Sequence, residues 1–95
     1  MITSPQFEMV AKLVKVLAVQ PNEIELLDLY GWYKQVKIGD INIPKPDTND
    51  IVKTKKWHAW NKVKGASLYD SQINYILIAN ILINKYGLKK HFSVE

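Results

Sequence analysis

Aromatic rings and lysines share faces of two predicted helices and could bind an anion. Tyr30, Tyr33 and Lys34 stand at positions i, i+3 and i+4, which places them on one side of a helix. A second helical side carries Lys53, Lys56, Trp57 and Trp60. Rings can stack on an adenine base, and ammonium groups beside them can pair with phosphates. Aromatic residues at helical spacing are also typical of a core, so both interpretations stay open at this point.

Catalytic chemistry has little support in the sequence. The histidines, His58 and His91, lack a second ligand at helical spacing of the H-E-x-x-H kind. The four glycines, at positions 31, 39, 65 and 87, form no phosphate-binding loop, and the carboxylates are not paired for acid–base work. With no cysteine, the chain has no disulfide, thiolate metal site or cysteine nucleophile. We therefore expect no enzyme activity, no catalytic residue, no metal site and no cofactor.

The basic residues are distributed in a way that suits phosphates better than base recognition. All 13 are lysines, against 9 acidic residues, and the net charge is +4. Lysine is a mobile point charge, whereas guanine is read by the planar fork of arginine. Residues 51–69 contain no acid, so the middle of the chain is a candidate anion-binding surface. We expect no specific nucleic-acid partner, although non-specific binding through this segment remains an alternative.

Length and composition predict one domain over residues 1–95. The chain has 95 residues, 47% of them hydrophobic, which is enough for a single core. Residues 1–5 lack the basic stretch and apolar run of a secretory signal, and we expect a cytoplasmic protein. The charge-free segment 71–84 spans about 21 Å as a helix, short of a hydrocarbon layer of roughly 30 Å.

Four helices are predicted, and the fold class is all-α. The first follows Ser4 and Pro5 and ends at Pro21, and the second is capped by Asn22 and closes at Gly39. Residues 39–49, with two prolines, are predicted to form a long ordered loop. The third helix runs from Asp50 to about Lys64, and the fourth from a capping box at Ser67 to Tyr86, before Gly87.

Several motifs, in order, resemble the acyl-CoA-binding protein family. Residues 29–35 (LYGWYKQ) and 38–42 (IGDIN) are similar to the family's LYGxYKQ…xGDxN signature. Residues 56–61 (KWHAWN) resemble its KWxAWN motif. Further matches are Lys45-Pro46, Asp50, Gly65, Ser67, Tyr75 and Tyr86-Gly87. The resemblance covers about residues 7–88 and leaves a short basic C-terminal tail, residues 89–95, without a counterpart.

The resemblance implies an up-down-down-up four-helix bundle that binds long-chain fatty acyl-CoA esters. Such a protein is an intracellular carrier and pool former in fatty acid metabolism and lipid transport. The positions matching coenzyme A head-group contacts are Tyr30, Tyr33, Lys34, Lys56, Tyr75 and Lys15. The positions matching the acyl-chain vicinity are Phe7, Ala11, Leu26 and Leu27. Trp57 and Trp60 match positions that are mainly core, so we no longer count them as stacking candidates.

The fourth predicted helix departs from the family pattern, and it motivates a rival function. From Tyr75 to Asn84, apolar residues cover almost every side, which a small bundle cannot bury completely. An exposed apolar face would suit transient membrane contact or self-association, and we otherwise expect a monomer. The rival is thus a helical module for protein or membrane interaction. A carrier should bind palmitoyl-CoA far more tightly than free CoA, which a nucleic-acid binder should not do.

Overall fold

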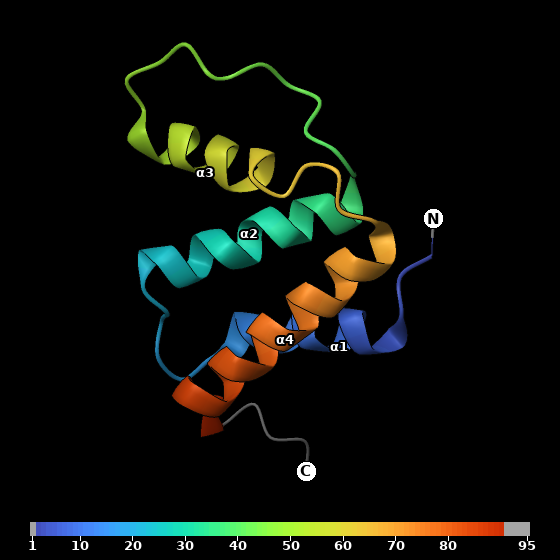
Figure 1. The fold of residues 1–95 in the computed structure, drawn as a ribbon. Helices are drawn as coiled ribbons and strands as arrows, with labels where there is room; N and C mark the ends of the chain where they lie inside the picture. The colour runs from blue at the N-terminus through green and yellow to red at the C-terminus, as the bar shows by residue number, and fades with distance from the viewer. Residues whose placement is uncertain (1, 91–95) are drawn as a thin grey trace.

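The computed structural model describes residues 2–90, which form four α-helices and one 3₁₀ turn (Figure 1). The elements are α1 (Pro5–Leu13), η1 (Val14–Val16), α2 (Glu23–Lys37), α3 (Ile51–Asn61) and α4 (Leu68–Tyr86). In Figure 1, α1 and α4 run in one direction and α2 and α3 in the other. The long connection between α2 and α3 returns along the bundle, which lets these two helices run parallel. The predicted all-α, up-down-down-up fold is confirmed.

Each predicted N-cap satisfies a backbone N–H in the first turn of its helix. The four caps are Ser4, Asn22, Asp50 and Ser67, whose side chains accept bonds from Phe7, Glu25, Lys53 and Asp70. At Asn22 the capping box is complete, because the Glu25 carboxylate also accepts from the Asn22 N–H. These side chains fix where the helices begin, as the sequence indicated.

The first helix is shorter than predicted. It ends at Leu13, a 3₁₀ turn follows, and Leu17 is extended (φ −61°, ψ 139°). The extended segment pairs with residues beyond α4: the Ala18 N–H donates to Gly87 O at 2.8 Å, and the Lys89 N–H to Val16 O at 2.9 Å. The prediction that the helix continues to Pro21 is wrong, because these tertiary backbone bonds replace the helical ones.

The third helix also ends earlier than predicted, at Asn61 instead of about Lys64. After it, the Val63 and Lys64 N–H groups donate to Trp60 O and Asn61 O, three residues back, so the chain tightens into turns. Gly65, with φ +92°, then redirects the chain. The predicted loop at residues 39–49 and the ends of α2 and α4 at Gly39 and Gly87 are confirmed.

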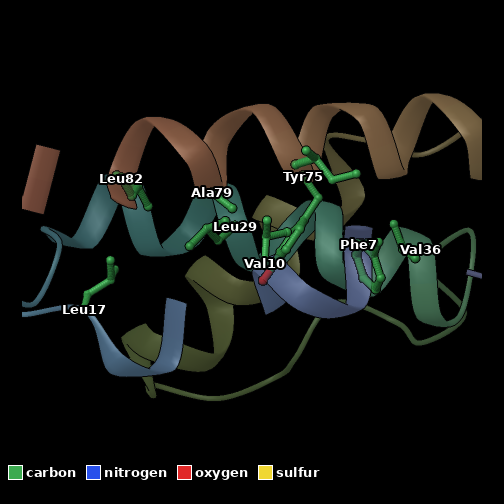
Figure 2. Packing of buried hydrophobic residues seen from close by; sticks show 9 residues of the cluster. Phe7, Val10, Leu17, Leu29, Val36, Tyr75, Ala79 and Leu82 are labelled. Carbon is green, nitrogen blue, oxygen red and sulfur yellow. The ribbon is translucent and has the colours of Figure 1, made fainter. Parts of the chain in front are cut away.

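The core lies between α1, α2 and α4 (Figure 2). Its members are Phe7, Val10, Leu17, Leu29, Val36, Tyr75, Ile76, Ala79 and Leu82. Figure 2 shows Leu17 and Leu82 toward one end, and Phe7 and Val36 toward the other. The third helix lies outside this core and packs on α2, with Trp60 only 2% exposed.

The two tryptophans of α3 hold the long loop. The Trp57 Nε1–H donates to Ile43 O at 2.9 Å, and the Trp60 Nε1–H donates to Gly39 O at 2.8 Å. Each ring therefore packs its apolar body beside α2 or the loop while its polar N–H is satisfied by loop backbone. Trp60 is buried, as the sequence analysis expected, but Trp57 is only half-buried and lies outside the core, so the expectation that it is a core residue is wrong.

Only one side of α4 is buried. Tyr75, Ala79 and Leu82 are 3% or less exposed, whereas a row at four-residue spacing, Ile73, Leu77 and Ile81, is 41%, 54% and 61% exposed. The expectation that the bundle leaves part of this apolar helix uncovered is confirmed. Within residues 2–90, no helix has the length and apolar content needed to cross a membrane. Membrane contact or self-association through this row stays a prediction.

The carboxylate of Glu25 ties the start of α2 to the end of α4. Its Oε1 accepts from the Tyr86 hydroxyl at 2.6 Å, and its Oε2 lies 2.8 Å from Lys85 Nζ. The bonds from Lys85, Tyr86 and the Asn22 N–H favour the charged carboxylate and lower the pKa of Glu25 to about 2.

We expect Glu25→Gln to destabilise the protein mainly above about pH 5. The pKa of Glu25 is about 2 in the folded state, below the ordinary value of 4.5, so its contribution is complete above the ordinary value and disappears as the pH falls toward 2. Thermal melts from pH 2 to 7 should show a Tm difference between wild type and variant that shrinks with acidification. Glu23→Gln, which removes a more exposed pair with Lys55, is the control. A Tm difference independent of pH would contradict this account.

Candidate ligand-binding site

A close backbone approach between α2 and α3 brings Tyr30 next to Lys56. Gly31 is buried, and a Cβ atom there would lie 2.4 Å from the carbonyl oxygen of Ala59. Because glycine has no side chain, the two helices can approach this closely. Beside the contact, Lys56 Nζ lies 5.3 Å from the centroid of the Tyr30 ring. The sequence analysis grouped rings and lysines within single helices, whereas the structure pairs the Lys56 ammonium group of α3 with the Tyr30 ring of α2.

The end of α2 is fixed by a hydrogen-bonded clamp around Asp40. Its Oδ1 accepts from the Gly65 N–H at 2.7 Å and from the Gln35 Nε2–H at 2.8 Å, and the same amide also donates to Ala66 O at 3.1 Å. The Gly65 and Gln35 bonds lower the pKa of Asp40 below its ordinary value. The clamp ties α2 to the connection between α3 and α4 and so holds the orientation of α2.

Lys34 points toward α3. Its Nζ lies 4.8 Å from the centroid of the Trp60 ring, and the side chain is partly buried. The contact positions the ammonium group without neutralising it, because an aromatic face carries no formal charge. Lys34 and Lys56 are therefore both held against rings at the junction of α2 and α3.

Three aromatic rings meet where α1, α2 and α4 converge. The Phe7 centroid lies 6.1 Å from that of Tyr33 and 5.0 Å from that of Tyr75, and the two tyrosines are 5.9 Å apart. Tyr33 is 37% exposed, whereas Phe7 has no exposed surface and Tyr75 only 3%. Phe7 therefore supports Tyr33 from beneath. Ala11, one turn further along α1, is half-buried and packs against the same core.

Burial raises the pKa of two of the predicted phenols, those of Tyr30 and Tyr75. Burial, with the neighbouring Tyr33 as a smaller cause, raises the pKa of Tyr75 to about 12. Burial also raises the pKa of Tyr30 above its ordinary value. A neutral phenol keeps its O–H and can donate to a phosphate oxygen. The site thus offers hydroxyl donors beside ammonium groups.

A groove runs along one side of α2 in two adjoining hollows, of about 320 and 460 Å³. The smaller one is lined by Pro21, Glu23, Leu26, Leu27, Val52 and Lys56, and the larger by Val14, Lys15, Leu17, Ala18, Leu26 and Lys89. Both hollows share Gln20 and Leu26, and we call them together the Leu26 groove. The structure therefore brings four predicted residues, Lys15, Leu26, Leu27 and Lys56, to one groove.

A larger hollow lies elsewhere. It has about 710 Å³ and opens between α3 and α4, lined by Trp32, His58, Val63 and Ile78 among others, and we call it the Trp32 hollow. Of the predicted site residues, it touches Leu27 alone. His58 is exposed there, and among residues 2–90 no three His, Asp or Glu side chains gather as a metal site. His91, the other histidine, lies outside the described residues. The Leu26 groove is lined by four of the predicted site residues and the larger hollow by one, whereas the predicted tyrosines and Lys34 line neither.

Sequence reasoning missed eight lining residues of the Leu26 groove: Val14, Leu17, Ala18, Gln20, Pro21, Glu23, Val52 and Lys89. Gln20 and Pro21 precede α2, Val52 lies in the first turn of α3, and Lys89 follows α4. Lys89 lies beyond residues 7–88, which the family resemblance covers. The sequence indicated Lys89 only as part of a basic tail. The position of Lys89 in the fold depends on backbone pairing that no local sequence pattern predicts.

Comparisons with known proteins show which family and which solved structures the chain resembles. A family model described as Acyl CoA binding protein matches residues 4–79. An acyl-CoA-binding protein homolog from Drosophila melanogaster is 40% identical over 86 residues, which is 90% of this chain and 100% of that protein. Acyl-CoA-binding protein 2 from Saccharomyces pastorianus is 41% identical over 86 residues, 90% of this chain and 99% of the relative. A solution structure of an acyl coenzyme A binding protein from yeast superposes with a TM-score of 0.73 at 40% identity, covering 90% of this chain and 99% of that one.

Proposed function

Because the chain belongs to the acyl-CoA-binding protein family, we propose that it binds long-chain fatty acyl-CoA esters and carries them, without catalysis, in the cytoplasm. The observation that carries the proposal is the Leu26 groove, in which Lys56, held against Tyr30, adjoins Leu26 and Leu27. An acyl-CoA has the matching division into an anionic nucleotide and an apolar tail. One groove with cations beside leucines suits such an amphiphile better than either nucleic acid or a purely apolar partner.

We assign the nucleotide end to the lysines and phenols at the junction of α2 and α3. Lys34 and Lys56 would pair with the 3′-phosphate, and Tyr30 would lie against the adenine and donate its neutral O–H. Tyr33 and Tyr75, supported by Phe7, would complete this end. Because both lysines are held by ring contacts, fewer rotamers are lost when a phosphate arrives.

The apolar end is assigned to the leucines. Burial of an acyl chain contributes about 0.8 kcal/mol of binding free energy per methylene. A dozen buried methylenes would therefore contribute on the order of 10 kcal/mol, before the entropic costs of binding are subtracted. The Leu26 side chain is 39% exposed, so it offers apolar surface that an acyl chain can cover. The proposed mechanism is sequestration: the protein covers the tail and thioester and releases the ester intact, with no bond made or broken.

Calorimetric titration with palmitoyl-CoA, free CoA and palmitate tests the function. Palmitoyl-CoA should bind far more tightly than either fragment, since only the ester engages both ends of the groove. Incubation with the protein should leave the thioester intact, so an assay for free CoA thiol should detect no release. Equal affinity for CoA and palmitoyl-CoA, or no binding of either, would overturn the proposal.

Lys34→Ala and Lys56→Ala should each weaken palmitoyl-CoA binding by roughly 1–3 kcal/mol, as expected for the loss of a charge-assisted hydrogen bond. The matched control is Lys62→Ala, which removes the same charge from a residue that lines the Trp32 hollow. The effect should shrink for the 3′-dephospho ester, because the phosphate that the lysines meet is then missing. If both variants bind palmitoyl-CoA as tightly as the control, the phosphate assignment is wrong.

A further inference from the structure

The chain beyond α4 forms part of the Leu26 groove. Leu88 pairs with Leu17 in an isolated antiparallel bridge. The Ala18 N–H donates to Gly87 O at 2.8 Å, and the Lys89 N–H donates to Val16 O at 2.9 Å. These bonds hold residues 87–89 beside η1. As a result, Lys89 lines the same hollow as Lys15, a residue 74 positions earlier in the sequence.

Lys15 and Lys89 bring two positive charges to this hollow. Among residues 2–90, neither ammonium group has a carboxylate oxygen within 4.0 Å, whereas Lys37, Lys55 and Lys85 each have one. The hollow's other walls are apolar or uncharged: Val14, Leu17, Ala18, Gln20 and Leu26. From the described residues that line this hollow, an anion would therefore meet two positive charges and no negative one.

We propose that Lys89, together with Lys15, forms a second anion subsite that holds a phosphate group of the bound ester. The inference rests on the proposed function and extends it to a residue outside the family match, which ends at residue 79. The hollow adjoins the one that contains Lys56 through Gln20 and Leu26, so an extended ligand can reach both. An acyl-CoA carries phosphate at two separate places, a diphosphate and a 3′-phosphate. Two separate cationic places in one groove match that division.

The side chain of Lys89 can be removed without breaking the bridge, because the bonds that hold the segment come from backbone groups. We expect Lys89→Ala to raise the Kd for palmitoyl-CoA about threefold to tenfold, the range for a partly exposed charge contact. Lys89→Gln, which keeps most of the side-chain length, should show a similar loss. The matched control is Lys90→Ala, which removes the same charge from an exposed neighbour outside the groove lining.

Repeating the titrations with palmitoyl-3′-dephospho-CoA identifies which phosphate is held. If Lys89→Ala also weakens the binding of this ester, Lys89 contacts the diphosphate. If the loss of affinity disappears with this ester, Lys89 contacts the 3′-phosphate. If wild type binds palmitoyl-CoA and Lys56→Ala weakens it, while Lys89→Ala and Lys89→Gln match Lys90→Ala, the second subsite is refuted and the proposed function stands. If wild type binds no acyl-CoA, both fail.

Discussion

Phe7→Ala is expected to lower the free energy of unfolding by about 3–5 kcal/mol, the usual cost of truncating a buried phenylalanine. Phe7 has no exposed surface and lies between α1, α2 and α4, with the Tyr33 and Tyr75 centroids at 6.1 and 5.0 Å. In a domain of this size each kcal/mol shifts Tm by roughly 4–8 °C, so Tm should fall by more than about 12 °C. Urea and thermal unfolding followed by circular dichroism would measure both quantities.

The ring of Phe7 should matter to the ligand as well as to stability. Without it, Tyr33 loses the surface on which it stacks, so palmitoyl-CoA affinity measured well below Tm should fall too. Met9→Ala, on the same helix at a residue 62% exposed, is the control and should change stability by less than about 0.5 kcal/mol. A loss below about 1 kcal/mol for Phe7→Ala would mean that the ring is not packed in the core.

Gly31→Ala is expected to destabilise the protein and to weaken ligand binding together. The added Cβ would meet Ala59 O at 2.4 Å and Ala59 C at 3.0 Å, and both are backbone atoms that move only with the helix. Overpacking of this kind costs roughly 1–3 kcal/mol, partly offset by about 1 kcal/mol from the better helix propensity of alanine. The α2–α3 spacing must widen, which separates Tyr30 from Lys56 and should reduce affinity at least as much as Lys56→Ala.

Gly65→Ala distinguishes the two effects of the Gly31 substitution. At Gly65 no atom lies within 4 Å of the added Cβ, but φ is +92°, so alanine there strains the backbone by about 1–2 kcal/mol. Both variants should lower the midpoint of urea unfolding. Only Gly31→Ala should raise the Kd for palmitoyl-CoA, measured where both are folded. Equal effects on binding would show that the α2–α3 contact does not set the site.

Local signals predicted most of the fold, and tertiary bonds account for the errors. The caps at Ser4, Asn22, Asp50 and Ser67 and the glycines after α2 and α4 act through their own neighbours, so the sequence reveals them. The end of α1 depends instead on bonds to residues 87 and 89, about 70 positions away. The helical spacing of apolar residues does not change at Leu13, so the sequence gives no sign of these bonds. Because that spacing continues to Ala18, it predicted a longer helix.

In the candidate site too, local sequence patterns predicted some features, whereas others depend on tertiary contacts. The spacing of Tyr30, Tyr33 and Lys34 placed them on one face, and the family resemblance supplied Lys56 and Tyr75 as partners. The contact between Tyr30 and Lys56 depends on how closely α2 approaches α3, which a single glycine permits and no periodicity reveals. Likewise, the sequence shows Lys89 only as part of a basic tail, and its place beside η1 requires the folded chain.

The attachment of α3 has a consequence for dynamics. Among the helices, its packing partner is α2, while α1, α2 and α4 share the core. Such an element can detach in a sub-global opening that costs less than complete unfolding, so its amides should exchange with solvent before those of α4. A ligand that bridges Tyr30 and Lys56 would fasten the helix from outside. The bound ligand would then act as a structural element of the fold, and α3 would detach more easily in the ligand-free protein.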